Sequence, residues 1–202
     1  VSRHACAPSY PSEEEMMTFI RDGSPHFRLR EDSALSQLHW STTRQGDWPE
    51  VLAFAFDHRS QLEAISDDTA KLSAFKDLCA DVTLKAMNRH PGKQLGLLCD
   101  HRLGQNALFT LAEAPLWIAS PIELPSSRPL RFEGGPSLAT TLRDWPKHQV
   151  VKCLCFTHPD DPAALWTEQA EALTELFEAT RSLGLELLLE FIPPNDMPRD
   201  HR

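Results

Sequence analysis

The chain has 202 residues, of which 41% are hydrophobic and 24% charged, as is ordinary for a globular protein of one or two domains. Its 29 acidic residues outnumber its 20 basic ones, giving a net charge of −9, and this excess disfavours nucleic acid as a partner. The apolar runs are too short to span a bilayer and no signal-peptide pattern stands at the start. We therefore expect a cytoplasmic protein without a membrane partner.

The first fifty residues differ from the rest of the chain in their pattern of apolar and polar residues. Ser12 followed by three glutamates predicts the start of a helix, because its hydroxyl can cap the first turn and negative charge is favourable there. That helix is expected to end near Asp22. Residues 23–50 are polar and lack a sustained period, so they predict a linker with one short helix at Leu35–Trp40.

From Val51 onward, apolar runs alternate with amphipathic stretches. The apolar runs predict strands of a buried parallel sheet, namely Val51–Phe56, Leu95–Cys99, Leu116–Ser120, Gln149–Phe156 and Leu185–Ile192. The stretches between them predict helices at Gln61–Asn88, Gly104–Glu113, Ser137–Arg143 and residues 162–183.

Two of these helices carry further signals. In the first, helical spacing predicts a buried apolar face made by Leu72, Phe75, Leu78 and Val82. In the last, Asp161 is expected to cap the first turn and Gly184 to end the helix.

Polar residues recur where the predicted strands end, at Asp57, Asp100 and Glu123, over Lys152–His158, and at Glu190. In β/α barrels the carboxyl ends of the strands form the rim of the active site. An open doubly wound sheet shows a similar rhythm but gives no reason for charge at every strand end. We expect an α/β fold, an incomplete (β/α)8 TIM-type barrel of about five parallel strands preceded by a short helix and a linker.

Several stretches carry a resemblance to a known fusion protein. Val1–Pro11 resembles the closing segment of ribokinase-type sugar kinases of the 5-dehydro-2-deoxygluconokinase family, which acts in inositol breakdown. The remainder resembles the C-terminal domain that many bacteria fuse to that kinase. The stretches that carry the second likeness are Phe54–Arg59, Gly96–Asp100, Pro121–Glu123, Arg128–Leu130, Trp145–Pro146, Val151–Leu154, His158–Asp161 and Leu188–Glu190.

The resemblance implies a domain organisation and an upstream partner. Residues 1–22 would be the tail of the kinase domain, residues 23–50 a linker, and residues 51–202 an aldolase-like β/α barrel that is cut off before it closes. The kinase would be covalently fused upstream, and its nucleotide-binding residues would precede Val1. An open parallel sheet of this kind is expected to be poorly soluble or to associate into homo-oligomers.

The C-terminal domain is in turn similar to tagatose-bisphosphate aldolases, which are class I enzymes on a β/α barrel. Their pattern is a strand ending in Asp-x-Arg, a later strand beginning Val-Lys, and then Leu-Glu-Ile. This resemblance implies that Asp57, Arg59, Lys152 and Glu190 fall on active-site positions. The family's Schiff-base lysine follows the Leu-Glu-Ile strand, so we expect it beyond Arg202 and expect the chain alone to be inactive.

By resemblance, the activity would be that of a lyase in myo-inositol catabolism. It would cleave 2-deoxy-5-keto-gluconate 6-phosphate, a small-molecule sugar phosphate, into dihydroxyacetone phosphate and malonate semialdehyde through an imine. No cofactor and no metal would be required. The alternative keeps the fold without the chemistry, as a sugar-phosphate-binding or scaffold domain of the kinase fusion protein.

The candidate catalytic residues each have a structural alternative. Lys152, inside an apolar strand, could contact substrate or lower the pKa of the imine lysine, or it could form a buried salt bridge with Glu190. Glu190 could be the general acid/base. Asp57 could bind a substrate hydroxyl or orient the lysine, or it could cap the helix that follows.

The remaining candidates are expected to bind substrate. Arg59 falls on the family's Asp-x-Arg pattern, whereas Asp100 and Glu123 could bind substrate or merely cap helices.

The sequence offers poor metal ligands. Its five cysteines form no CxxC pair, and Cys153 and Cys155 would share one face of a strand. Buried or half-buried reduced thiols are the expectation for them. His158, Asp160 and Asp161 lie close in sequence, but a lone histidine beside two loop acids is a weak metal signature.

Overall fold

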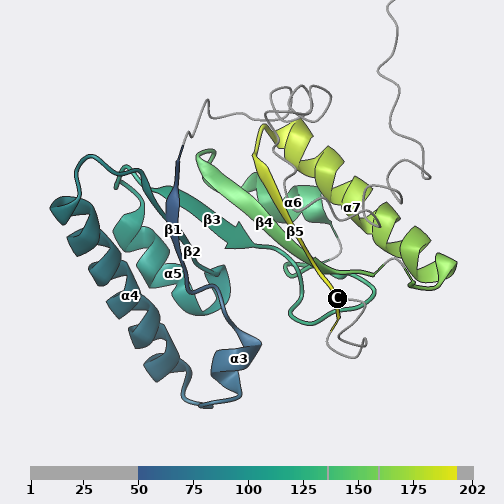
Figure 1. Ribbon diagram of the computed structural model, residues 1–202, viewed down its shortest axis with the longest axis horizontal. Coiled ribbons are helices and arrows are strands. Elements are labelled where there is room, and N and C mark those ends of the chain that lie inside the picture. The colour runs from purple at the N-terminus through teal and green to yellow at the C-terminus, as the bar shows by residue number, and fades with distance from the viewer. Residues whose placement is uncertain (1–49, 136, 159, 195–202) are drawn as a thin grey trace, which may run out of the picture.

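The computed structural model of the chain describes residues 50–135, 137–158 and 160–194 (Figure 1). The helix predicted after Ser12, the linker with its short helix at Leu35–Trp40, and the kinase-like tail lie outside the described residues. The division of the chain into domains therefore stays a prediction.

The sheet has five parallel strands that follow one another in sequence order. They are β1 (Leu52–Ala55), β2 (Leu95–Leu98), β3 (Trp117–Pro121), β4 (Gln149–Phe156) and β5 (Leu187–Ile192). Doubly wound sheets reverse their strand order at a switch point, and this sheet has no such reversal. The expected α/β fold with five parallel strands is confirmed, with each strand within two residues of its predicted bounds.

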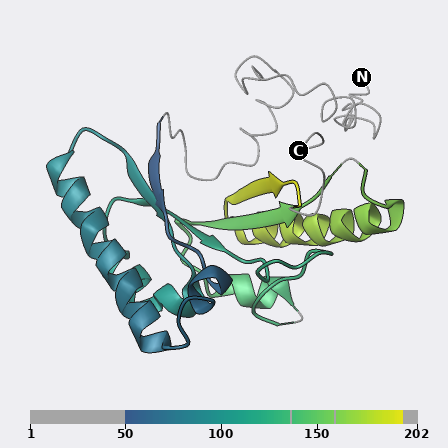
Figure 2. The ribbon, with the colours of Figure 1, turned by 60° about the horizontal axis from the view of Figure 1, so that its bottom comes forward.

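The helices gather on one side of the sheet, which curls into a half-barrel (Figure 2). They are α3 (Ser60–Glu63), α4 (Thr69–Arg89), α5 (His101–Leu111), α6 (Leu138–Arg143) and α7 (Ala163–Leu183). The opposite side of the sheet is its concave face. Side chains that point there from different strands converge, and this convergence positions the site described below.

One long helix over Gln61–Asn88 was a wrong prediction. The segment folds as α3 and α4, separated by residues 64–68, and the Asp68 side chain caps α4 by accepting a hydrogen bond from the Lys71 amide at 3.1 Å. Serine and aspartate side chains compete for backbone hydrogen bonds, so Ser66 and Asp68 favour a break over a continuous helix.

The predicted buried face of that helix was also wrong in part. Leu72 is buried, but Phe75, Leu78 and Val82 are 46%, 57% and 49% exposed. The buried positions of α4 are instead Leu72, Lys76, Cys79, Ala80 and Thr83. Helical spacing alone could not select this face, because the charge of Lys76 is neutralised inside the protein by Asp100.

Contacts at the helix ends explain where the other observed helix boundaries differ from the predicted ones. The Asp100 side chain caps α5 by accepting from the Leu103 amide at 2.7 Å, so α5 begins before the predicted Gly104. Gly104 lies inside α5, where a β-carbon would collide with the sulfur of Cys99. Gly184 ends α7 with φ of 68°, as predicted.

The prediction that Asp161 caps α7 was wrong. Pro162 occupies the N-cap position, and no side chain there makes a capping hydrogen bond. The Asp161 carboxylate instead accepts from the His158 amide at 2.9 Å and pairs with Arg128. The competing cation, Arg128 in the segment between β3 and α6, explains the difference.

The helix side of the sheet holds two hydrophobic clusters. One packs Val151, Cys153 and Cys155 of β4 against Leu142 and Leu176. The other is formed by Phe56, Cys79, Ala80, Leu97, Cys99, Ala107, Leu111, Leu116 and Ile118. The four cysteines of the described residues are buried and free, as expected, and burial raises the pKa of Cys99 to about 12 and that of Cys155 to about 11.

A small cluster formed by His101, Trp145 and Gln149 lies on the helix side of the sheet, beside these hydrophobic clusters. The His101 ring stacks on Trp145 with centroids 4.4 Å apart, and its Nε2 lies 3.2 Å from Gln149 Nε2. Burial lowers the pKa of His101, against an opposing effect of the Asp100 charge.

This environment predicts loss of stability in acid. A histidine whose pKa is lower in the folded state binds fewer protons there than in the unfolded state, so the free energy of unfolding falls as pH falls through about 6.5. Chemical denaturation between about pH 7.5 and 5.5 should show a smaller loss for His101→Gln than for the wild type. An equal pH dependence in both proteins would contradict this reading.

Both edge strands expose apolar side chains. On β1 Leu52 and Phe54 are 48% and 46% exposed, and on β5 Phe191 is 56% exposed. Within the described residues, no strand pairs with the outer edge of β1 or of β5. Self-association, expected of such edges, stays a prediction. No helix among the described residues combines the length and the apolar character needed to cross a membrane.

Candidate functional site

Three charged side chains meet on the concave face of the sheet. The Lys152 Nζ atom lies 3.1 Å from Asp57 Oδ2 and 3.1 Å from Glu190 Oε2. Lys152 is on β4, Asp57 follows β1 and Glu190 is on β5. We refer to these three residues as the Lys152 centre.

The curl of the sheet makes this meeting possible. Neighbouring strands lie about 4.8 Å apart, so β1 and β4, with two strands between them, would be about 14 Å apart in a flat sheet. A lysine side chain alone does not bridge that distance to a carboxylate. Contact between Asp57 and Lys152 therefore follows from the half-barrel shape.

The alternation of side chains along β4 directs Lys152 to the concave face. Val151, Cys153 and Cys155 pack into the cluster on the helix side. Successive side chains of a strand point to opposite faces, so Lys152 points away from the helices. Its position within an apolar strand leaves it only 5% exposed, and the neighbouring carboxylates compensate its buried charge.

The charges around Lys152 stabilise its ammonium form. Burial alone would lower the pKa of Lys152, but the negative charges of Asp57 and Glu123 and hydrogen bonds to Asp57 and Glu190 raise it above the ordinary value. A lysine that forms an imine must attack as a neutral amine, which requires a lowered pKa. Lys152 is therefore suited to act as a cation and not as the imine nucleophile.

The three members of the centre differ in access to solvent. The side chains of Lys152 and Asp57 are 6% and 10% exposed, whereas that of Glu190 is 47% exposed. Glu190 is thus the member that a bound molecule can reach most readily. The contact with Lys152 is the salt bridge that the sequence left open as the structural alternative.

A second pair, Arg59 and Glu123, lies beside the Lys152 centre. Arg59 Nη1 donates to the Glu123 carbonyl oxygen at 2.7 Å, and Nη2 pairs with Glu123 Oε1. Arg59 Nη1 also lies 3.1 Å from Glu133 Oε2. The other carboxylate oxygen of Glu123 accepts from the Leu154 amide of β4 at 3.1 Å. The Arg59–Glu123 pair therefore ties the segments after β1 and β3 to β4.

The pKa of Glu123 is shifted mainly by the burial of its side chain. Burial raises the pKa of the Glu123 carboxyl, although Arg59, the Leu154 amide and Lys152 act in the opposite direction. Arg59 and Glu123 are 4% and 5% exposed. Two of the three predicted substrate-binding residues, Arg59 and Glu123, are thus engaged with each other, and any bound molecule would meet them as a pair.

Asp100 does not belong to the Lys152 centre. One of its carboxylate oxygens lies 2.6 Å from Lys76 Nζ, and the other accepts from the Leu103 amide. Asp100 has no exposed surface. Its geometry favours the helix cap, which is the alternative that the sequence left open for this residue.

Sequence reasoning missed Lys76, a lysine of α4 with no exposed surface. Its Nζ lies against Asp100 and donates to the carbonyl oxygens of Phe56 and His58. Its spacing from Leu72, Cys79 and Ala80, all buried on the same helix, was the available signal.

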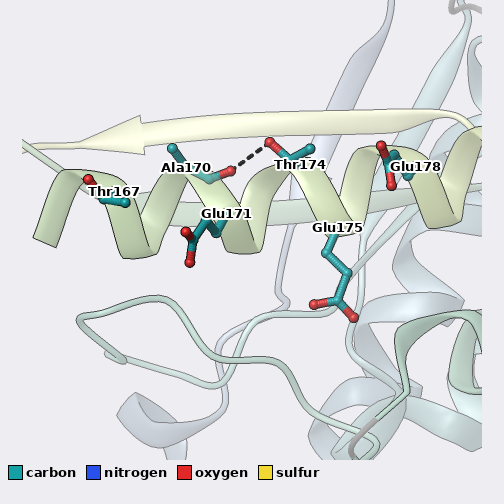
Figure 3. A pocket seen from close by; sticks show the side chains of 6 residues that line it. All are labelled: Thr167, Ala170, Glu171, Thr174, Glu175 and Glu178. Atoms are coloured by element: carbon teal, nitrogen blue, oxygen red, sulfur yellow. Dashed lines mark hydrogen bonds between the residues drawn. The ribbon is translucent and has the colours of Figure 1, made fainter. Parts of the chain in front are cut away.

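A shallow pocket on α7 offers no competing catalytic site. It is lined by side chains of that helix alone, namely Thr167, Ala170, Glu171, Thr174, Glu175 and Glu178 (Figure 3). The Thr174 hydroxyl is occupied, because it donates to the Ala170 carbonyl oxygen at 2.7 Å. Three glutamates disfavour a phosphorylated ligand there.

The described residues contain no group of three or more histidine, cysteine, aspartate or glutamate side chains arranged to hold a metal ion. The nearest sequence candidate is the pair His158 and Asp160, whose Nδ1 and Oδ2 atoms lie 3.6 Å apart. Asp161, the third member of that sequence cluster, is engaged with Arg128.

Comparison with curated proteins found no match to this chain. A family model does match, over residues 15–202, and this range includes every described strand and helix. The chain belongs to the family described as "Uncharacterized protein conserved in bacteria (DUF2090)".

Proposed function

We propose that this chain is an aldolase-type lyase domain that acts on a phosphorylated keto sugar acid. The observation that carries the proposal is the Lys152 centre, where a buried ammonium lies between two carboxylates contributed by different strand ends. Acid/base groups around a fixed cation suit carbon–carbon cleavage, in which a proton moves and negative charge develops.

The proposed scaffold is an incomplete TIM-type barrel. Parallel strands in sequence order, with helices on one side only, are the arrangement of the first five β/α units of an eight-stranded barrel (Figure 2). In such barrels the active site lies at the carboxyl ends of the strands. Asp57 lies two residues after the end of β1, and Glu190 lies in the second half of β5.

The proposed reaction is a retro-aldol cleavage between C3 and C4 of 2-deoxy-5-keto-gluconate 6-phosphate, the substrate that the family resemblance suggests. A lysine imine at C5 accepts the electron pair of the breaking bond and becomes an enamine. The C3 hydroxyl gives up its proton and C3 leaves as the aldehyde of malonate semialdehyde. Protonation at C4 and hydrolysis of the imine release dihydroxyacetone phosphate.

Each member of the Lys152 centre has a role in this proposal. Glu190, the most exposed, takes the proton of the C3 hydroxyl. Lys152 remains an ammonium and stabilises negative charge that develops on the substrate oxygen. Asp57 holds Lys152 in place and accepts a hydrogen bond from a substrate hydroxyl.

The imine lysine is proposed to come from outside the described residues. The two buried lysines of the described part are unsuitable, because Lys152 is held as an ammonium and Lys76 has no exposed surface. The resemblance to class I aldolases suggests an imine lysine on a later strand. It also suggests an upstream sugar kinase in the same polypeptide.

Reductive trapping tests this proposal. The full-length protein is incubated with the substrate and sodium borohydride, and its peptides are then mapped by mass spectrometry. We expect a stable adduct on a lysine that follows Glu190 in the sequence, and no adduct when the substrate is omitted. Tight substrate binding without an adduct or cleavage would contradict the lyase and support the alternative, a sugar-phosphate-binding or scaffold domain.

A further inference from the structure

Lys76 is a buried cation that sequence reasoning missed, and its contacts converge on the segment that carries Asp57. Its ammonium donates to the carbonyl oxygens of Phe56 and His58, the second at 2.8 Å, and to Asp100 Oδ1 at 2.6 Å. An ammonium has three hydrogens, so these three acceptors use its full donor capacity. The side chain is thereby fixed in a single arrangement.

The two carbonyl groups held by Lys76 flank Asp57. In an extended chain the carbonyls of residues i−1 and i+1 point to the same side, so one ammonium can hold both. This contact fixes the Phe56–Asp57 and His58–Arg59 peptide groups, which lie on either side of Asp57. The direction of the Asp57 side chain, and hence its 3.1 Å contact with Lys152, depends on that backbone.

Asp100 anchors the other end of this arrangement. Its second carboxylate oxygen accepts from the Leu103 amide in the first turn of α5. Lys76 of α4 is therefore connected through Asp100 to the end of β2 and the start of α5. The backbone around Asp57 is held against two helices, which gives it little freedom to move.

We propose that Lys76 is a positioning residue, which aims the Asp57 carboxylate at Lys152 by holding the carbonyl oxygens of Phe56 and His58 against Asp100. It touches no substrate, because it has no exposed surface. Its importance for catalysis rests on the proposed function. Its effect on the contact between Asp57 and Lys152 does not, and it can be measured without substrate.

The test is the titration of the Lys152 side chain in Lys76→Met, followed by NMR in the full-length protein with labelled lysine. Asp57 contributes to the raised pKa of Lys152, so loss of its alignment should lower that pKa. Removal of the Lys76 charge by itself acts in the opposite direction, because a nearby cation disfavours a second one. The sign of the shift therefore separates positioning from simple electrostatics.

Two further variants complete the experiment. In an Asp57→Asn background, Lys76→Met should cause no further fall in the pKa of Lys152, because the group being aimed has lost its charge. Lys85→Met, an exposed position on the same helix, is the matched control and should leave the pKa unchanged.

A folding defect would not prevent the test. Lys76→Met alone leaves the buried Asp100 charge without its partner, whereas the double variant Lys76→Met/Asp100→Asn removes both charges and retains an acceptor for the Leu103 amide. A fall in the Lys152 pKa in either folded variant supports the proposal. An unchanged or raised pKa overturns it, whatever the outcome of the trapping experiment on the proposed function.

Discussion

Replacing Lys152 with methionine is expected to lower the kcat for the proposed cleavage of a phosphorylated keto acid by about 10²- to 10³-fold, as loss of one preorganised charge donor commonly does. The ammonium lies 3.1 Å from both carboxylates of its centre, and methionine retains most of the length of the side chain without the charge. Release of malonate semialdehyde by the full-length protein, measured in a coupled assay, gives the rate.

The matched control is Lys93→Met, which removes an exposed lysine from the turn before β2. Its kcat should equal that of the wild type. Circular dichroism establishes that both variants are folded, so that a lost rate is not lost structure. Unchanged turnover in folded Lys152→Met would show that the Lys152 centre does not take part in the reaction.

Replacing Arg59 with methionine is expected to lower the free energy of unfolding by about 3–5 kcal/mol, the usual effect of removing one partner of a buried ion pair. Arg59 and Glu123 are both buried, and the Glu123 carboxylate would lose its principal counter-charge. The loss should be greatest at neutral pH, where that carboxylate is charged, and should shrink as the pH falls through the range in which carboxyls protonate. Urea denaturation measures it.

Two further variants serve as a rescue and as a control for this result. Arg59→Met/Glu123→Gln should recover part of the lost stability, because glutamine is neutral and its side-chain oxygen can still accept from the Leu154 amide. Arg131→Met breaks the exposed pair with Glu168, whose side chains are 54% and 45% exposed, and should cost no more than about 1 kcal/mol. Equal losses in Arg59→Met and Arg131→Met would contradict the assigned burial.

The strands were predictable from the sequence because each is an apolar run that ends in polar residues. β4 was predicted with its observed bounds, Gln149–Phe156. The helices were harder, since Phe75, Leu78 and Val82 have ideal helical spacing yet face outward on α4. Spacing identifies a helix and an apolar stripe, but only tertiary contacts decide which face the sheet buries.

Part of the candidate site was likewise predictable from the sequence and part was not. Asp57, Lys152 and Glu190 were predicted to converge because parallel strands present their carboxyl ends at one edge, and the structure brings them together. The roles of Asp100 and Lys76 could not be predicted, because the partner of a buried charge is known only once α4 packs beside β2. The Arg59–Glu123 pair likewise depends on contact between segments 64 residues apart.

We propose that a phosphorylated keto acid binds on the concave face, against the Lys152 centre. A crystal structure of the full-length protein soaked with this substrate tests it most directly. We expect ligand density at the carboxyl ends of β1, β4 and β5, with a substrate oxygen within hydrogen-bonding distance of Glu190 or Lys152. Density confined to the helix side of the sheet, for example along α7, would contradict it.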